Sequence, residues 1–234
     1  MDGSRCAMVL AAGRGERMRP LTDAVPKPLL AAGGKPLIVW QIEALARAGF
    51  RDIVVNAAHL ADCFVAALGT GTALGATLRW SFEPEALETA GGIATALPLL
   101  PGRVALIVSG DIWTTFDYAT LIRRAAAMAR DAAAPRVHLV MVPNPNYHRA
   151  GDFALVDGRI AQDGAPRRTY ANIGLYDTGL FRELPRGTSL ELLPYLQRWI
   201  AGGLVSGEYF AGPWANIGSP DDLASLDANL RRPL

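Results

Sequence analysis

Three residue types that often build functional sites are scarce in this chain of 234 residues, which has two cysteines, two lysines and three histidines. Cys6 and Cys63 are too few and too far apart for a disulfide framework or a zinc site, so we expect both to be buried, reduced thiols. Nearly all of the positive charge is arginine, and Lys27 and Lys35 are the only lysines.

A strong excess of one charge and a long apolar run are missing as well. The formal net charge is +1, which gives no electrostatic reason to expect nucleic acid or a membrane surface as a partner. The apolar run near the amino terminus is interrupted by Gly13 and Arg14, too soon for a membrane span. Reading it as a signal peptide would discard the glycine-rich loop described below, so we expect a cytoplasmic protein.

The chain does have a regular alternation of strand-like and helix-like segments. The pattern predicts strands over 7–10, 51–58, 76–82, 104–111 and 137–142, and helices over 36–49, 60–68 and 118–134. Such alternation predicts a parallel sheet covered by helices, with right-handed crossovers. The continuous apolar run at 104–111 is typical of a central strand.

Beyond Pro143 the segments become shorter. We expect a hairpin over 153–164 that turns at Asp157 and Gly158, strands over 170–177 and 203–210, a helix over 189–203 broken near Pro194, and a helix over 221–230 capped by Ser219. These elements predict one α/β domain over 1–234, with a Rossmann-like mixed, mainly parallel sheet sandwiched by helices. A nucleotide-binding half over about 1–142 would precede a sugar-binding and metal half over about 143–234.

The first predicted strand is followed by a glycine- and arginine-rich stretch over 10–28. Gly13 and Gly15 allow the backbone to approach a ligand and to point its amides at phosphate oxygens. The stretch lacks the third glycine of a dinucleotide fingerprint and the end of a P-loop, so a simple turn would explain the glycines about as well. Arg17, Arg19 and Lys27 favour a triphosphate over a bare turn, because they place three cations beside this backbone.

Several segments together resemble the sugar-1-phosphate nucleotidyltransferases. They are LAAGRGERMRPLTDAVPKPLL from Leu10, ETAGGI from Glu88, SGDIW from Ser109, NPNYHRAGDF from Asn144 and WANIGSPDDL from Trp214. Within the family, ETAGGI, GDIW and NPxxHxxGDF are most similar to the branch that transfers a uridylyl group to N-acetylmuramic acid 1-phosphate. The resemblance implies attack of a sugar 1-phosphate on UTP, release of pyrophosphate, and Mg²⁺ as cofactor. The nucleophile is already ionised, so positioning and charge neutralisation would suffice without a general base.

The resemblance also implies a role for individual residues. Arg17, Lys27 and Asp111 would be catalytic, with Asp111 also binding magnesium. The nucleotide contacts would be Leu10, Ala11, Ala12, Gly13, Gly15, Glu88, Thr89, Gly91 and Gly92, and the sugar contacts would be Trp113, Asn144, Asp152 and Asn172. Each position has a simpler reading: Asp111 could begin a turn, Lys27 could be a solvated loop residue, and Thr89 could cap a helix.

Asn216 departs from the family's pattern, in which an aspartate at this position is the second magnesium ligand. An amide oxygen brings no charge to the metal, which prefers anionic oxygen. The alternatives are an enzyme with weaker metal binding, a transferase for another pair such as GTP with mannose 1-phosphate or CTP with a phosphorylated alcohol, and a nucleotide-sugar sensor without turnover. The retention of Arg17, Lys27 and Asp111 counts against the sensor.

Overall fold

The structure is a computed structural model that describes residues 5–232, and its largest sheet has nine strands. Their order across the sheet is β5-β4-β1-β6-β11-β8-β12-β10-β9. The strands are β1 (Cys6–Leu10), β4 (Asp52–Ala57), β5 (Thr77–Phe82), β6 (Val104–Ser109), β8 (Val137–Val142), β9 (Phe153–Val156), β10 (Arg159–Ala161), β11 (Arg167–Asp177) and β12 (Val205–Tyr209). The two termini of the predicted domain, 1–4 and 233–234, lie outside the described residues.

The sheet has a parallel part and a mixed part. β5, β4, β1 and β6 all pair in parallel, and β12 pairs in parallel with β8. β11 is antiparallel to both β6 and β8 and joins the two parts. The α/β architecture with a Rossmann-like first half is therefore confirmed, and β6 takes the buried interior position expected of its apolar run.

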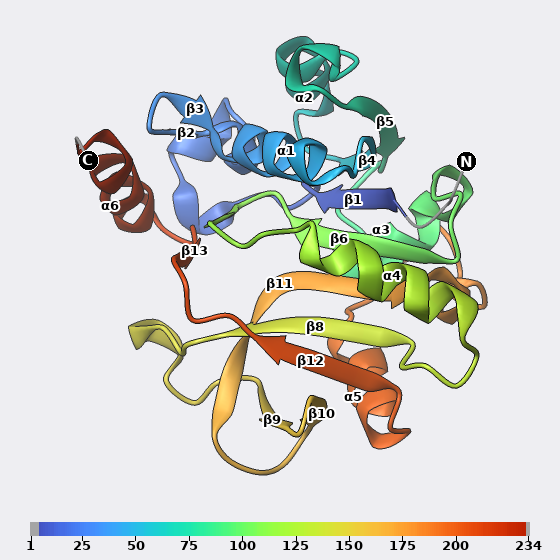
Figure 1. Cartoon of the computed structure of the whole chain (residues 1–234). Coiled ribbons are helices and arrows are strands. Elements are labelled where there is room, and N and C mark those ends of the chain that lie inside the picture. The colour runs from blue at the N-terminus through green and yellow to red at the C-terminus, as the bar shows by residue number, and fades with distance from the viewer. Residues whose placement is uncertain (1–4, 233–234) are drawn as a thin grey trace.

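Helices cover both faces of the sheet (Figure 1). α1 (Leu37–Ala48), α2 (Ala61–Leu68) and α4 (Thr120–Arg130) contribute to one apolar core, which includes Ile42, Phe64 and Leu121. α3 (Glu88–Ala96) and α5 (Leu193–Ala201) contribute to a second core on the other face, which includes Ile93 and Trp199. Because residues at period 2 along each strand face opposite sides, one sheet supplies both cores.

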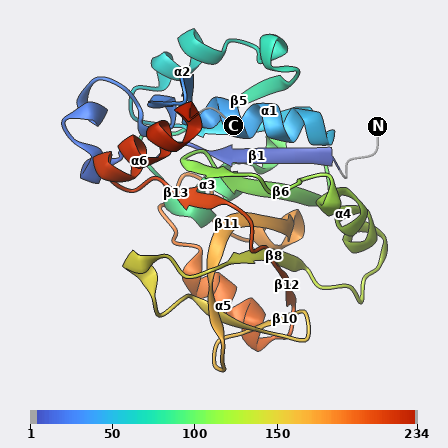
Figure 2. The ribbon, with the colours of Figure 1, turned by 60° about the vertical axis from the view of Figure 1, so that its left-hand side comes forward.

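The carboxy-terminal helix α6 (Pro220–Arg231) packs away from the main sheet, beside the ribbon β2 (Ala31–Ala32) and β3 (Lys35–Pro36) (Figure 2). It follows a second small ribbon, in which β13 (Trp214–Asn216) pairs antiparallel with β7 (Ile112–Thr114). Ser219 caps α6 as predicted, since its Oγ accepts from the Asp222 amide. This arrangement returns the end of the chain to the residues that follow β6.

Some boundaries differ from those expected. α5 begins at Leu193 with Pro194 in its first turn, so the expected break is the helix start, where proline needs no amide partner. α4 ends at Arg130, before the expected 134. Cys63 is only half-buried, whereas Cys6 is buried and burial raises the pKa of its thiol to about 12. The hairpin turn at Asp157 and Gly158 is as predicted, with φ values of 49° and 74°.

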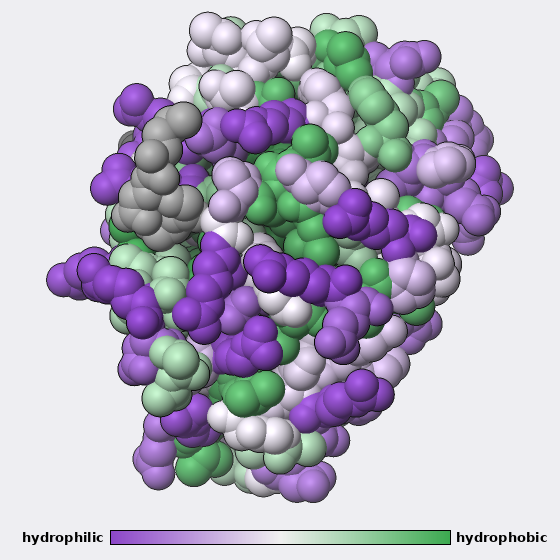
Figure 3. Space-filling view, turned by 90° about the vertical axis from the view of Figure 1, so that its right-hand side faces the viewer, coloured by the Kyte–Doolittle hydropathy of each residue, from purple (hydrophilic) through white to green (hydrophobic). Residues whose placement is uncertain are grey.

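The face on which the parallel strands begin carries scattered hydrophilic side chains with smaller hydrophobic areas between them (Figure 3). The strands point from this face toward the opposite end of the sheet, where Leu10 and Ser109 end β1 and β6. None of the helices described within 5–232 has the length and apolar content needed to cross a membrane.

Candidate active site

The loop after β1 is built around Gly15. This residue has φ 66°, and a Cβ on it would lie 2.9 Å from Lys27 Cβ and 3.0 Å from Thr22 Cγ2. Thr22 Oγ1 also donates a hydrogen bond to the Gly15 carbonyl, at 2.9 Å. Glycine is thus needed both for the left-handed backbone and for close packing on the lysine stem. The short 3₁₀ helix of Glu16–Met18 follows and presents Arg17.

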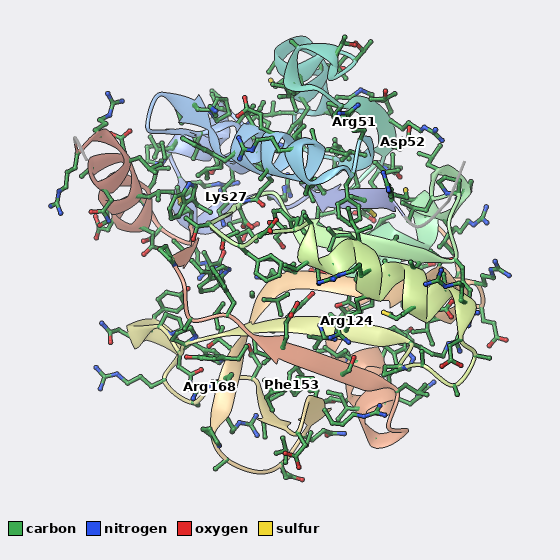
Figure 4. The ribbon with its side chains drawn as sticks, in the orientation of Figure 1. Lys27, Arg51, Asp52, Arg124, Phe153 and Arg168 are labelled. Carbon is green, nitrogen blue, oxygen red and sulfur yellow. The ribbon has the colours of Figure 1, made fainter. Side chains whose placement is uncertain are left out.

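Lys27 pairs with Asp111 across 84 positions of sequence. Lys27 starts the 3₁₀ helix Lys27–Leu29 and is 9% exposed, and its Nζ lies 2.6 Å from Asp111 Oδ2. Figure 4 shows Lys27 on the opposite side of the molecule from Arg51 and Asp52, where β4 begins. The lysine is therefore a buried ion-pair partner at the carboxyl ends of the parallel strands, where open α/β sheets bind ligands.

A cavity of about 410 Å³ surrounds this pair. Its lining includes all three predicted catalytic residues and seven of the nine predicted nucleotide contacts: Leu10, Ala11, Ala12, Gly13, Gly15, Glu88 and Thr89. We call it the first cavity. The structure thus brings the loop after β1, the start of α3 and the residue after Gly110 together around one space.

Gly91 and Gly92 do not line this cavity, and both are buried where α3 packs against the rest of the protein. A Cβ on Gly91 would lie 2.1 Å from the Thr188 carbonyl oxygen. The alternative interpretation of the segment from Glu88 as a helix start is confirmed, because Glu88 begins α3, but Leu87 rather than Thr89 stands at the N-cap. Close packing therefore explains why position 91 is glycine. The predicted base contacts of Gly91 and Gly92 stay predictions.

A second cavity, of about 540 Å³, adjoins the first and shares Leu10, Glu88, Thr89 and Ser109 with it. Two of the predicted sugar contacts, Asp152 and Asn172, line it, together with His148. Asp152 Oδ1 lies 2.9 Å from His148 Nε2, and its Oδ2 accepts from the Tyr170 amide at 2.7 Å. Asn172 has φ 57° and lies where the β11 register shifts against β8. A left-handed asparagine at such an irregularity re-aims its side chain.

Asn144 and Trp113 lie outside the second cavity. The Asn144 amide donates to the carbonyls of Arg149 and Arg167, and its oxygen accepts from Thr169. Trp113 instead lines a third cavity, of about 380 Å³, beside α6. Asn144 therefore holds the chain around the second cavity together, and direct sugar contact by either residue stays a prediction.

The two predicted magnesium ligands come from segments that are hydrogen-bonded to each other, but Asp111 lines the first cavity and Asn216 lines the second and third. Asn216 pairs with Ile112 in the β7–β13 ribbon, and the Ile217 amide donates to the Asp111 carbonyl at 3.0 Å. Asp222 is occupied by its own cap, accepting from the Gly218 amide and the Ser219 hydroxyl. No cluster of three histidine, cysteine or acidic residues suited to a metal occurs among residues 5–232. One carboxylate with one amide fits Mg²⁺ only when substrate phosphates and water complete its shell.

Two residues of this region were missed in the sequence. Asn56 is the penultimate residue of β4 and lines the first cavity, and its Oδ1 accepts from the Ala11 amide at 2.9 Å. Glu83 follows β5, is 5% exposed and accepts from Asn56 at 2.7 Å. Burial raises the pKa of the Glu83 carboxyl, against the hydrogen bonds from Asn56 and Leu87 that lower it. Both lie at strand ends, the signal that singled out Asp111.

Comparison with known sequences decides the family, because a sequence model described as Nucleotidyl transferase matches residues 6–232. The chain belongs to the nucleotidyl transferase family. It is 42% identical over 217 residues to an N-acetylmuramate alpha-1-phosphate uridylyltransferase from Neisseria meningitidis serogroup B, covering 91% of this chain and 93% of the relative. A protein of the same name from Caulobacter vibrioides is 34% identical, with 97% of each chain covered.

Other members of the nucleotidyl transferase family are more distant. A mannose-1-phosphate guanylyltransferase from Mycobacterium tuberculosis is 27% identical, and the match spans 97% of this chain and 64% of that relative. Among solved structures, a Bacillus anthracis protein described as a glucose-1-phosphate thymidylyltransferase superposes with a TM-score of 0.83 at 21% identity, covering 98% of this chain and 96% of that one. At that identity the superposition shows a shared fold.

Proposed function

We propose that this nucleotidyl transferase moves a uridylyl group from UTP to N-acetylmuramic acid 1-phosphate, giving UDP-N-acetylmuramic acid and pyrophosphate, with Mg²⁺ as cofactor. The observation that carries the proposal is the position of Lys27 and Asp111, 2.6 Å apart in a cavity that shares its wall with a second, sugar-sized one. Two relatives of the same name, at 42% and 34% identity, support the choice of substrates.

The reaction needs two phosphates to meet in line. A sugar phosphate oxygen forms a bond to the α-phosphorus of UTP as the bond from that phosphorus to the oxygen bridging the α- and β-phosphates breaks, and pyrophosphate leaves with that oxygen and the electron pair. Arg17 and the backbone from Ala11 to Gly15 would bind the triphosphate in the first cavity. Lys27 would neutralise charge that develops at the reacting centre, a contribution that needs no proton transfer.

Asp111 and Asn216 would hold the magnesium ion, which when bound supplies positive charge to the phosphate oxygens. In the structure the Asp111 carboxylate is paired with Lys27 and its side chain is 27% exposed, so it can exchange this partner when anionic phosphates enter. His148, oriented by Asp152, would contribute to binding the sugar in the second cavity.

GTP with mannose 1-phosphate is the second candidate pair, because the family also contains the guanylyltransferase relative at 27% identity. A panel that crosses UTP, GTP, CTP and ATP with N-acetylmuramic acid, N-acetylglucosamine and mannose 1-phosphates tests the two. Pyrophosphate release is measured over a wide magnesium range. We expect turnover with UTP and N-acetylmuramic acid 1-phosphate; a preference for a purine nucleotide contradicts the uridylyl assignment, and nucleotide binding without any release contradicts catalysis.

A further inference from the structure

A chain of buried hydrogen bonds connects the loop after β1 to the start of α3. The Ala11 amide donates to Asn56 Oδ1 at 2.9 Å, Asn56 Nδ2 donates to Glu83 Oε1 at 2.7 Å, and the Leu87 amide donates to Glu83 Oε2 at 3.0 Å. Asn56 is 3% exposed and Glu83 is 5% exposed. Water therefore does not compete for these groups, and each bond depends on its protein partner.

The backbone amides at the two ends of this series of hydrogen bonds determine which groups donate and which accept. Backbone amides at Ala11 and Leu87 can only donate, so the side chains at 56 and 83 must each accept once at their outer end. Between them, one side chain must donate to the other. Asn56 offers one oxygen and one amide group, and the Glu83 carboxylate accepts on both oxygens, so every group is satisfied.

The hydrogen bond between Asn56 and Glu83 also depends on the space left by a neighbouring glycine. A Cβ on Gly92 would lie 2.9 Å from both Asn56 Nδ2 and Glu83 Oε1. Glycine at this position of α3 therefore leaves room for the hydrogen bond between the two side chains. It explains Gly92 by its contact with the pair, independently of any contact with a base.

Both ends of the hydrogen-bond chain reach residues of the first cavity. Ala11 lines the cavity, and Leu87 precedes Glu88, which lines it too and has φ 57°. Such a strained residue persists only where its surroundings over-determine it, and the Leu87 bond to Glu83 is one of these constraints. Glu83 itself does not line the cavity, so it can act on a ligand only through its partners.

We propose that Glu83 is a positioning residue that, through Asn56 in the wall of the first cavity, fixes the loop after β1 relative to the first turn of α3 and thereby sets the affinity for the nucleotide. The inference rests on the proposed function in taking the first cavity as the nucleotide's. Binding is strongest when the groups that contact the two ends of a ligand are held in place before it arrives. If one of these hydrogen bonds is broken, the loop after β1 and the start of α3 are no longer held in place relative to each other.

Exchanging the two side-chain types provides the test. In Glu83→Gln two amides face each other, and in Asn56→Asp two carboxylates do, so each single variant leaves one mismatched pair. In the double variant N56D/E83Q the donor simply moves to position 83, while the amides of Ala11 and Leu87 again meet acceptors. Only the direction of the central bond changes.

Three measurements are made on each variant: the Kd for UTP by calorimetry, the melting temperature, and amide hydrogen exchange at Ala11 and Leu87. We expect each single variant to bind UTP about tenfold more weakly, equivalent to about 1.4 kcal/mol, and to exchange faster at both amides. The double variant should return to within about threefold of the wild-type Kd. Ser206→Ala is the matched control, since it removes a buried bond to His138 outside the first cavity and should lower stability alone.

A purely structural pair would lower the melting temperature of the single variants and leave their Kd for UTP unchanged, which overturns the proposal. A double variant that folds and still binds weakly also overturns it. If a single variant does not fold, Gly92→Ala, which crowds the same bond, takes its place, and an unchanged Kd there has the same meaning. Failure of the wild type to bind UTP contradicts the proposed function instead, and amide exchange still decides whether loop and helix are coupled.

Discussion

Lys27 has lost most of its contact with water, and its partner Asp111 is the group that holds its charge in place. Replacing it by methionine keeps the stem that packs against Gly15 and removes only the ammonium. We expect Lys27→Met to lower kcat by a factor of about 10³, the size of effect seen when a preorganised charge is removed from a transition state. Pyrophosphate release at saturating substrates measures it.

The only other lysine of the chain supplies the control. Lys35 forms an ion pair with Glu43 and lies 4.3 Å from the centre of the Trp40 ring, outside the three cavities described. Lys35→Met should change kcat less than twofold, because no phosphate comes near it. Equal activity of both variants would remove Lys27 from the mechanism.

Asn216 provides a second prediction about a single residue. Asn216→Asp adds a second carboxylate opposite Ile112, the residue that follows Asp111, and Mg²⁺ prefers anionic oxygen. We expect the magnesium concentration for half-maximal activity to fall severalfold, by about 1 kcal/mol of metal affinity. Gln197→Glu, on the exposed side of α5, adds the same charge outside the three cavities and should leave the magnesium dependence unchanged. An unchanged requirement in Asn216→Asp would contradict the metal role of position 216.

Individual residues were predicted where a charged group ended a strand or joined glycine-rich backbone, as for Lys27 and Asp111. Asn56 lies near the end of β4 and Glu83 follows β5, yet their importance lies in bonding to each other and, for Asn56, to the Ala11 amide 45 positions away. A strand-end amide gives no sign in the sequence of which neighbouring strand it reaches. Residue types were therefore readable from the sequence, and their pairing was not.

At the scale of elements, a glycine of α3 and a glycine of the loop after β1 have different roles. Gly91→Ala places a methyl group 2.1 Å from a backbone oxygen, so α3 must shift, and we expect a loss of about 2–4 kcal/mol of folding free energy, typical of overpacking. Gly13→Ala meets nothing within 4 Å and should change stability by less than about 0.5 kcal/mol while weakening nucleotide binding, since Gly13 lines the first cavity. Urea unfolding and UTP titration of both variants separate the two effects; comparable stability of the two would refute the packing argument.

The junction after β11 carries a pH-dependent contribution to stability. Burial raises the pKa of the Asp177 carboxyl, but hydrogen bonds from Arg136, the Gly179 amide and Arg103 outweigh burial and hold that pKa below its ordinary value. A carboxyl with a lowered folded-state pKa stabilises the fold above its unfolded pKa of about 3.9, and this stability is lost as pH falls through the folded pKa. The contribution of Asp177 is therefore complete at neutral pH and disappears in acid.

We expect Asp177→Asn to cost about 2 kcal/mol at pH 7, since it weakens charge-assisted hydrogen bonds to a buried acceptor. The difference from wild type should persist down to about pH 5 and shrink below about pH 4. Urea unfolding at a series of pH values measures it. Asp52→Asn, whose partner Arg79 is as exposed as Asp52 itself, is the control and should show little effect. A difference that grows in acid would have the wrong sign for this explanation.

Most elements were predicted from the spacing of apolar residues and from the residues that begin or end helices and turns. Burial of one face of an element imposes the apolar spacing directly. The start of α3 was predicted only as an alternative, with Thr89 as its cap, and the start of α5 was placed too early. α5 begins at Leu193 because Pro194 suits a first turn, although the apolar pattern starts earlier, and Glu88 enters α3 with a left-handed φ that no propensity favours. Tertiary contacts, such as the Leu190 carbonyl that accepts from the Ala90 and Gly91 amides, fix the α3 start.

In the whole molecule, the order of strands in the sheet departs most from the order in the sequence. The parallel part contains β1, β4, β5 and β6 in the order β5-β4-β1-β6, as expected for parallel strands joined by helical crossovers. β11 instead enters between β6 and β8, which precede it, and it pairs antiparallel with both. The alternation of helices and strands could not predict this insertion, because it is a pairing between segments more than 60 positions apart for β11 and β6.

The position of β11 predicts that the two halves, about 1–142 and about 143–234, do not fold separately. A fragment of residues 1–142 would leave the apolar β6 and β8 without the strand that lies between them, and its core would lose Ala171, Ile173 and Leu175. Unpaired apolar edges of this kind associate rather than stay exposed. We expect fragment 1–142 to aggregate or to melt without a cooperative transition, whereas the whole chain unfolds in one step by calorimetry.

Co-expression of the two fragments completes this test. Because β11 and β12 in the second fragment each pair with strands of the first, the fragments together can rebuild the sheet. We expect the mixture to regain a cooperative transition and UTP binding that neither fragment has alone, since the first cavity also uses Gly218 from the second half. A cooperative transition in fragment 1–142 by itself would show an independent nucleotide-binding domain, and β11 would then be an addition to a finished core.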